Sequence, residues 1–152
     1  PLSKWQIIGG KYLASLIIVV IALLPTLMYV FTIKSLSTGG IDGGGIAGAY
    51  IGLVFLSAAF TAIGICCSSF TNNAVVAFLS SAFACFILYN GFTTISGIPS
   101  LQGGWDYFIE MIGINFHYRS LSRGAVDSRD MIYFLSIIVL FLFSTRKKLL
   151  NR

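Results

Sequence analysis

The side chains best suited to chemistry lie in one stretch, residues 117–130, which reads HYRSLSRGAVDSRD. It holds five of the fifteen charged side chains and the single histidine, between hydrophobic runs on both sides. The candidate site residues are His117, Arg119, Arg123, Asp127 and Asp130. A histidine beside two arginines can sense pH or bind an anion. The alternative, which we favour, is a structural histidine with ion pairs to Asp127 or Asp130, in a stretch that stays solvated.

The sequence gives little support for a hydrolase triad, a phosphate-binding loop or a cysteine-based metal or redox site. Ser120 or Ser122 with His117 and Asp127 would supply the residue types of a hydrolase triad, but adjacency in sequence gives no geometry. The segment GGIDGGG lacks the Lys-Ser/Thr of a phosphate-binding loop, and the three cysteines lie in apolar runs without zinc or redox spacing. We therefore predict no catalytic residue, no metal site and no cofactor in this chain.

The composition predicts a membrane protein. Of 152 residues, 57% are hydrophobic and 10% are charged, and the mean hydropathy is +0.89. Soluble domains have about 25% charged residues, so this chain has too little polar surface to cover itself in water. The length fits one domain, 1–152. We predict an all-α polytopic helix bundle.

Four apolar runs predict four membrane spans, at 12–33, 46–67, 74–95 and 131–145. The first has 22 residues without a charge, and at 1.5 Å per residue it covers about 33 Å, enough for the hydrocarbon core. The fourth is short, but Asp127 and Asp130 can cap its start, and the basic residues after it can reach the interface.

Several local patterns refine these helices. Ser3 and Gln6 form a capping-box pattern, so a helix is expected to begin at Lys4. Pro25 lies inside the first span and should kink it. The second span begins with Gly44, Gly48 and Gly52 at four-residue steps, called here the glycine ridge, on which another helix can pack closely.

The segment 96–130 connects the third and fourth spans. Within it, Trp105, Phe108, Ile109, Ile112 and Phe116 recur at helical spacing. This pattern predicts one short interfacial or re-entrant helix at 105–116, followed by the charged stretch.

The distribution of charge predicts the orientation. With four spans both ends lie on one side of the membrane, and that side has six basic and no acidic residues, whereas the other has four basic and five acidic residues. By the positive-inside rule both ends are cytoplasmic and residues 96–130 are extracytoplasmic. Because the net charge of +5 is explained by topology, nucleic-acid binding is not expected. No predicted span contains an ionisable Asp, Glu, Lys, Arg or His, which argues against a proton- or ion-coupled carrier.

Two long stretches resemble a known family: PLSKWQIIGGKYLASLIIVVIALLPTLMY near the start and INFHYRSLSRGAVDSRDMIYFLS near the end. They are similar to the membrane subunit of ABC-2-type transporters, and most similar to the gliding-motility-associated permease of Bacteroidetes. The resemblance runs over nearly the whole chain. It implies a permease of six transmembrane helices, of which this sequence, beginning at Pro1 and not at Met, is expected to hold the last four.

The resemblance also implies partners. An ABC ATPase subunit would bind ATP and magnesium, since this chain has no Walker A pattern. A second permease subunit, in a homo- or heterodimer, would complete the path, in the inner membrane of a bacterium. The charged residues from His117 to Asp130 would then form an extracytoplasmic gate or dimer contact. The competing hypothesis is a non-transport scaffold or anchor for a machine of the cell envelope.

Overall fold

The computed structural model describes residues 3–99, 103–124 and 126–150. Within these ranges the chain is helical and has no strand, which confirms the predicted all-α class. The elements are α1 (Lys4–Leu23), η1 (Leu24–Thr26), α2 (Leu27–Leu36), α3 (Gly43–Phe70), α4 (Ala74–Phe86), η2 (Ile87–Gly91), α5 (Phe92–Ser96), α6 (Asp106–Ile112), α7 (Ile114–Ser122) and α8 (Ser128–Leu150).

Among the residues that the structure describes, four helical rods are long and apolar enough to cross a membrane. They are Lys4–Leu36, Gly43–Phe70, Ala74–Ser96 and Ser128–Leu150. The last is longer than the apolar run at 131–145, because Asp127 Oδ1 accepts a hydrogen bond of 3.0 Å from the Arg129 N–H and so caps a start at Ser128. The second rod likewise begins earlier than the predicted span at 46–67, at Gly43, since Asp42 accepts hydrogen bonds from the backbone of Gly44 and Gly45.

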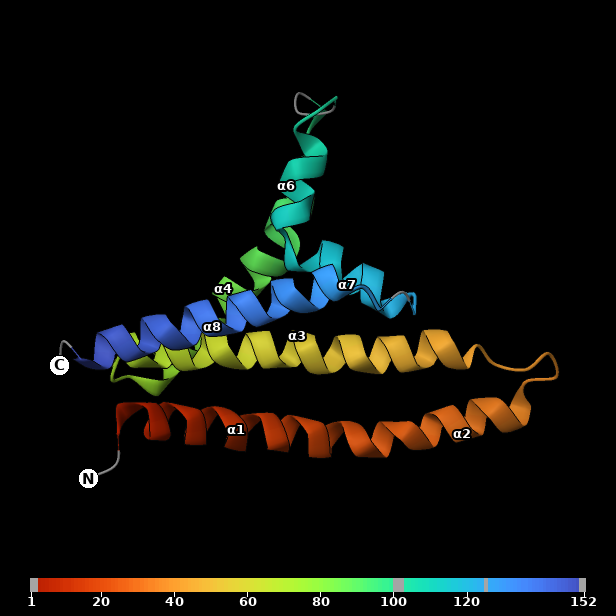
Figure 1. The fold of residues 1–152 in the computed structure, drawn as a ribbon, viewed down its shortest axis with the longest axis horizontal. Coiled ribbons are helices and arrows are strands. Elements are labelled where there is room, and N and C mark those ends of the chain that lie inside the picture. Colours follow the sequence, from red (N-terminus) through yellow and green to blue (C-terminus); the bar gives the residue numbers. More distant parts are fainter. Residues whose placement is uncertain (1–2, 100–102, 125, 151–152) are drawn as a thin grey trace.

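Helix α3 is the central element of the bundle. It packs against α1, α4, α7 and α8, and Figure 1 shows α1 and α2 along one side of it and α8 along another. The buried cluster shared by α3 and α8 includes the small residues Ala59 and Ala62 of α3 and Phe134 of α8, all of them fully buried. Small residues let two helix backbones approach closely, which is how membrane helices gain packing energy.

The first rod begins and bends as local chemistry dictates. Ser3 and Gln6 form the predicted capping box at the start of α1. Pro25 has no N–H to donate, and the helix tightens there into the 3-10 turn η1, where the Leu24 N–H donates to the Ile21 carbonyl. The Thr26 hydroxyl donates to the Leu23 carbonyl at 2.6 Å. The result is a slight bend, and α2 continues nearly in the direction of α1 (Figure 1).

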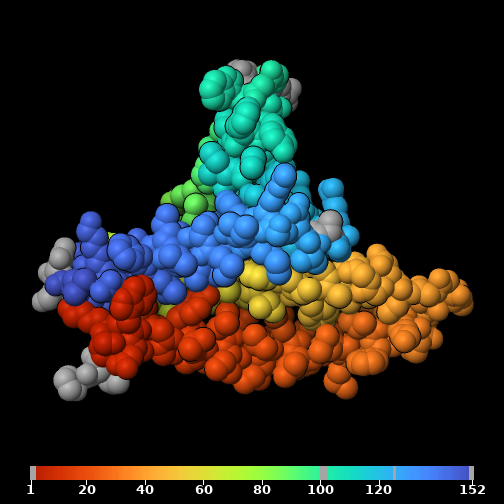
Figure 2. All heavy atoms as spheres, viewed as in Figure 1, coloured from red at the N-terminus to blue at the C-terminus, as the bar shows by residue number. Residues whose placement is uncertain are grey.

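The prediction of one continuous helix at 105–116 is wrong. The chain forms two helices, α6 and α7, separated by Gly113, whose backbone is extended (φ −75°, ψ 142°). A Cβ at Gly113 would lie 3.0 Å from Cβ of Phe92, so the break allows a close approach to α5. Helix α6 stands across the direction of α3 and α8, and it projects from the body in the space-filling view (Figures 1 and 2).

The first and last helices meet at one end of the bundle, the terminal end. Lys4 Nζ donates to the Leu149 carbonyl at 2.5 Å, and the Arg146 guanidinium lies 5.0 Å from the ring centre of Trp5. Helix α7 and the loop between α2 and α3 lie toward the opposite end, called here the α7 end (Figure 1).

Candidate functional site

The charged stretch is built around one buried pair. His117 of α7 and Asp130 of α8 each expose about 5% of their surface, and Nδ1 of His117 lies 2.7 Å from Oδ1 of Asp130. The other ring nitrogen, Nε2, lies 2.9 Å from the Met111 carbonyl oxygen. A carbonyl can only accept, so Nε2 carries a proton and donates it. The histidine therefore joins the last turn of α6 to α7 and α8.

Tyr133 strengthens this junction from α8. Its ring stacks on His117 with 3.8 Å between ring centres, and its hydroxyl donates to the Ile112 carbonyl. Tyr133 lies three residues after Asp130, so both side chains leave the same face of α8. This spacing is the sequence signal that could have identified Tyr133, which is not among the predicted site residues.

The pair lies in an apolar environment. Ile114, Leu121 and Phe134 are fully buried in the core of the bundle. Asp130 Oδ2 is also buried, and it has no hydrogen-bond partner within the described parts of the chain. In a low-dielectric interior both a hydrogen bond and an unpaired polar atom have larger energetic effects than in water. If either residue of the pair is removed, the other stays buried without its partner, and the desolvation of that group is then a large energetic cost.

The expectation that the whole stretch is solvated is wrong for His117 and Asp130, because packing of α7 between α3 and α8 covers both. Arg119, Arg123 and Asp127 are exposed. Arg119 is paired, but with Glu110 of α6, at 3.8 Å between Nη1 and Oε1, and not with Asp127 or Asp130. The five candidate residues therefore divide into a buried pair and an exposed group.

The glycine ridge lies under this site. A Cβ at Gly48 would meet the Leu121 carbonyl oxygen at 2.6 Å, and one at Gly52 would lie 3.3 Å from Cβ of Leu121. Gly44 lies against Gly124, the residue with a positive φ (+82°) that ends the turn after α7. The ridge thus receives α7 and not one of the long helices.

Two further contacts hold α7 against the third span. The Asn115 amide donates to the Thr93 hydroxyl of α5 at 3.3 Å. The rings of Tyr118 and Tyr89 lie 6.2 Å apart between centres. Burial raises the pKa of the Tyr118 hydroxyl, and the neighbouring Tyr89 raises it further.

The geometry does not assemble a hydrolase triad. The Ser122 hydroxyl donates to the carbonyl of Arg119 in its own helix, Asp127 caps α8, and both His117 nitrogens are occupied. Within residues 3–99, 103–124 and 126–150, no three His, Cys, Asp or Glu side chains gather closely enough to hold a metal ion. What this arrangement does is fix α6, α7 and α8 to one another.

Comparison with known proteins gives the family. Residues 1–143 match the family described as ABC-2 family transporter protein. Neither the search of curated proteins nor the search of solved structures gave a match. The matched segment covers most of the chain and includes all of the first three membrane-spanning rods and most of the fourth. The chain is thus an all-helical, multi-pass membrane protein that belongs to the ABC-2 family of transporter proteins, whose members are permease subunits.

Proposed function

We propose that this chain is the membrane permease subunit of an ATP-driven exporter, in which a separate ABC ATPase binds and hydrolyses ATP with magnesium. The observation that carries the proposal is the family match over residues 1–143, together with the four helices suited to a membrane in the part of the chain that the structure describes. Permeases of this family work with an ABC ATPase. A second permease subunit, identical or homologous, would complete the transport path.

We infer that the terminal end faces the cytoplasm, in the inner membrane of a bacterium. Lys4, Arg146 and Lys148 gather at that end, where Arg146 lies over Trp5 and Lys148 lies 5.1 Å from the ring centre of Phe70. Basic residues mark the cytoplasmic side, and their contacts with aromatic rings are typical of the membrane interface. The α7 end, with its mixed charges, would then face outward.

The exposed members of the charged stretch are the proposed gate or subunit contact. Arg119 and Arg123 line a depression of about 370 Å³ between α6 and α7, together with Glu110, Phe116 and Ser120. In this proposal His117 and Asp130 hold α7 in position, and the arginines meet the exported substrate or the second subunit. Asp127 contributes as the cap of α8.

Helix α3 is the element through which rearrangement would be transmitted in this proposal. It contacts α1 and α8 and carries α7 on the glycine ridge. A shift of α1 and α8 at the terminal end, where Lys4 joins Leu149, would reach α7 through α3. Closure of the ATPase at the cytoplasmic side would in this way act on the outward end.

One observation supports the narrower assignment to the gliding-motility permeases of Bacteroidetes. It is the resemblance of the two stretches at 1–29 and 114–136, and the family match does not distinguish this subtype. We therefore propose the broader exporter function, which rests on the family match. A role in gliding motility stays a narrower hypothesis.

The experiment that tests the function is purification of the full-length protein from its native membrane, followed by an ATPase assay on the complex. An exporter permease should bring down an ABC ATPase in stoichiometric amount, and the ATPase activity should change when the permease is removed. If no ATPase copurifies after gentle solubilisation, while stable envelope proteins do, the exporter function is rejected and the protein is a scaffold or anchor.

A further inference from the structure

Helix α6 has its polar and apolar faces reversed relative to a helix in water. Trp105, Phe108 and Ile112 expose 74%, 62% and 57% of their surface, whereas Asp106 and Glu110 are partly covered. A surface helix of a soluble protein places its apolar stripe inward. A contiguous apolar surface of this kind marks contact with a membrane or a partner.

The position of α6 along the bundle points to the membrane. The Tyr133 hydroxyl donates to the Ile112 carbonyl, which places the end of α6 beside the second turn of α8. Tyr133 lies five residues after Ser128, about 8 Å inside the start of that span. Figure 1 shows that α6 runs across the direction of α8. With the start of α8 at the membrane surface, α6 would therefore extend sideways at the depth of the acyl chains.

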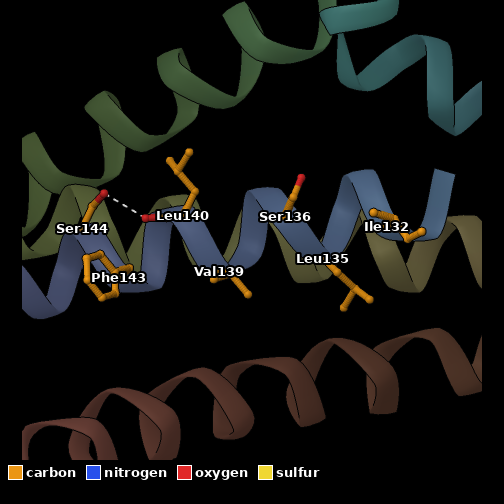
Figure 3. Close-up of a pocket in the computed structure, with 7 residues that line it drawn as sticks. All are labelled: Ile132, Leu135, Ser136, Val139, Leu140, Phe143 and Ser144. Atoms are coloured by element: carbon orange, nitrogen blue, oxygen red, sulfur yellow. Dashed lines mark hydrogen bonds between the residues drawn. The ribbon is translucent and has the colours of Figure 1, made fainter. Parts of the chain in front are cut away.

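A groove lies between α6 and α8 at this depth. It has a volume of about 620 Å³, and its walls include Phe108, Met111 and Ile112 from α6 and Ile132 and Tyr133 from α8. A second groove of about 640 Å³ begins at the same Ile132 and continues along α8 to Ser144 (Figure 3). Volumes of this size are typical of binding sites for small molecules.

The continuation along α8 offers no free polar group. Ser136 and Ser144 line it, but the Ser136 hydroxyl donates to the Tyr133 carbonyl at 2.6 Å. The Ser144 hydroxyl donates to the Leu140 carbonyl at 2.8 Å (Figure 3). The remaining lining residues are apolar, among them Leu135, Val139 and Phe143. The groove from Ile132 to Ser144 runs about 18 Å, which exceeds half of the ~30 Å hydrocarbon core. Its chemistry and length suit an alkyl chain.

One cation stands at the mouth of the groove. Arg129 lines the part between α6 and α8, is exposed, and forms no ion pair with any residue that the structure describes. Two acidic residues flank it in sequence: Asp130 is paired with His117, and Asp127 accepts the backbone N–H of Arg129 as part of the cap. The guanidinium is therefore left for an anion, and it fits a phosphate with two parallel hydrogen bonds.

We propose that this groove binds an anionic phospholipid of the leaflet at the α7 end, with an acyl chain along α8 and the phosphate on Arg129. The groove is lined by His117 but by neither of the proposed gate arginines, Arg119 and Arg123, and the proposal rests on the chain being embedded in a bilayer. Phosphatidylglycerol is the probe of choice, because phosphatidylcholine has the same chains and phosphate but no net charge.

Native mass spectrometry of the full-length, delipidated protein tests this proposal, with phosphatidylglycerol and phosphatidylcholine titrated separately. A basic residue near an anionic headgroup changes affinity about fivefold. We expect phosphatidylglycerol to bind about fivefold more tightly at the first site, and Arg129→Gln to abolish this preference. Ile132→Trp should fill the groove and remove the first site for both lipids.

Lys34→Gln is the matched control, since Lys34 is also a cation toward the α7 end but lines neither part of the groove. It should keep the preference. Equal affinity for the two lipids, or an unchanged preference in Arg129→Gln, would overturn the proposal. So would efficient intermolecular disulfide formation by Ile132→Cys in a background lacking Cys66, Cys67 and Cys85, because a second copy would then cover the groove.

Discussion

Gly48 of α3 lies against Gly124 beyond α7, so closely that a Cβ at position 48 would be 2.5 Å from the Cα of Gly124. The atoms it would meet are backbone atoms, which cannot move aside as a flexible side chain can. Gly48→Ala should therefore push α7 off α3 and destabilise the protein by about 1–3 kcal/mol, the range for overpacking. Thermal unfolding in detergent measures this loss.

Gly64 provides the control in the same helix, because a Cβ there would meet nothing within 4 Å. Gly64→Ala should be neutral or stabilise by up to about 1 kcal/mol, since alanine is the better helix former. Equal unfolding temperatures for the two variants would show that the contact of α3 with α7 does not contribute to stability.

Because the His117–Asp130 pair is buried, we expect the effects of the two residues on the free energy of unfolding to be strongly coupled. Each of His117→Ala and Asp130→Ala leaves a buried polar partner unsatisfied and should cost about 3–5 kcal/mol, the cost of breaking a buried pair. The double variant should cost less than the sum of the two, because neither partner is then left alone. A double-mutant cycle from chemical unfolding gives the coupling energy.

The exposed pair of Arg119 and Glu110 is the reference for that cycle. At 3.8 Å, and with 55% of the arginine side chain exposed, this pair should have a coupling below about 1 kcal/mol. A coupling between His117 and Asp130 no larger than this reference would contradict the buried role assigned to the pair.

The cap of α3 predicts a local effect. Asp42 accepts the N–H groups of Gly44 and Gly45, both at 3.1 Å, and three successive glycines follow it. Asp42→Ala should cost about 1 kcal/mol and fray the first turn, whereas Asp42→Asn keeps a capping oxygen and should not. Hydrogen exchange of the Gly44 and Gly45 amides reports the difference; equal protection in the two variants would exclude capping by Asp42.

Charge reversal tests the proposed gate. Arg119→Glu with Arg123→Glu changes two exposed side chains, so folding should be nearly unaffected. If these arginines meet the substrate or the second subunit, transport or stimulated ATPase activity should fall at least tenfold. Transport, ATPase stimulation and subunit assembly that all stay at the level of the unchanged protein would remove the gate from the proposal.

Much of the fold could be predicted from local sequence. The capping box at Ser3, the apolar length of the first rod and the glycines of the ridge are short-range signals, and each gave the right element. Helix α8 was predicted too short because hydropathy counts side chains, whereas its ends are set by the Asp127 cap and by basic residues that remain helical.

The site could be predicted only in part, because its contacts are long-range. Nothing in the spacing of His117 and Asp130 distinguishes a buried pair from two solvated residues. The break at Gly113 was missed because the apolar period at 105–116 continues through it, and the reason for the break is the close approach of Phe92 in another helix. Likewise, the partner of Arg119 is Glu110 across that break.

The third span contains the π-helical segment η2, Ile87–Gly91, between α4 and α5. A π turn holds one more residue than an α turn, so residues beyond it are rotated by about 100° relative to an uninterrupted helix. Thr93, which follows this segment and accepts a hydrogen bond from Asn115 of α7, owes its direction to that extra residue. Loss of one residue here would leave a regular helix that fits the bilayer equally well, yet Thr93 would turn away from Asn115. Small length changes at this point offer evolution a way to re-aim one end of a span while the other end keeps its packing.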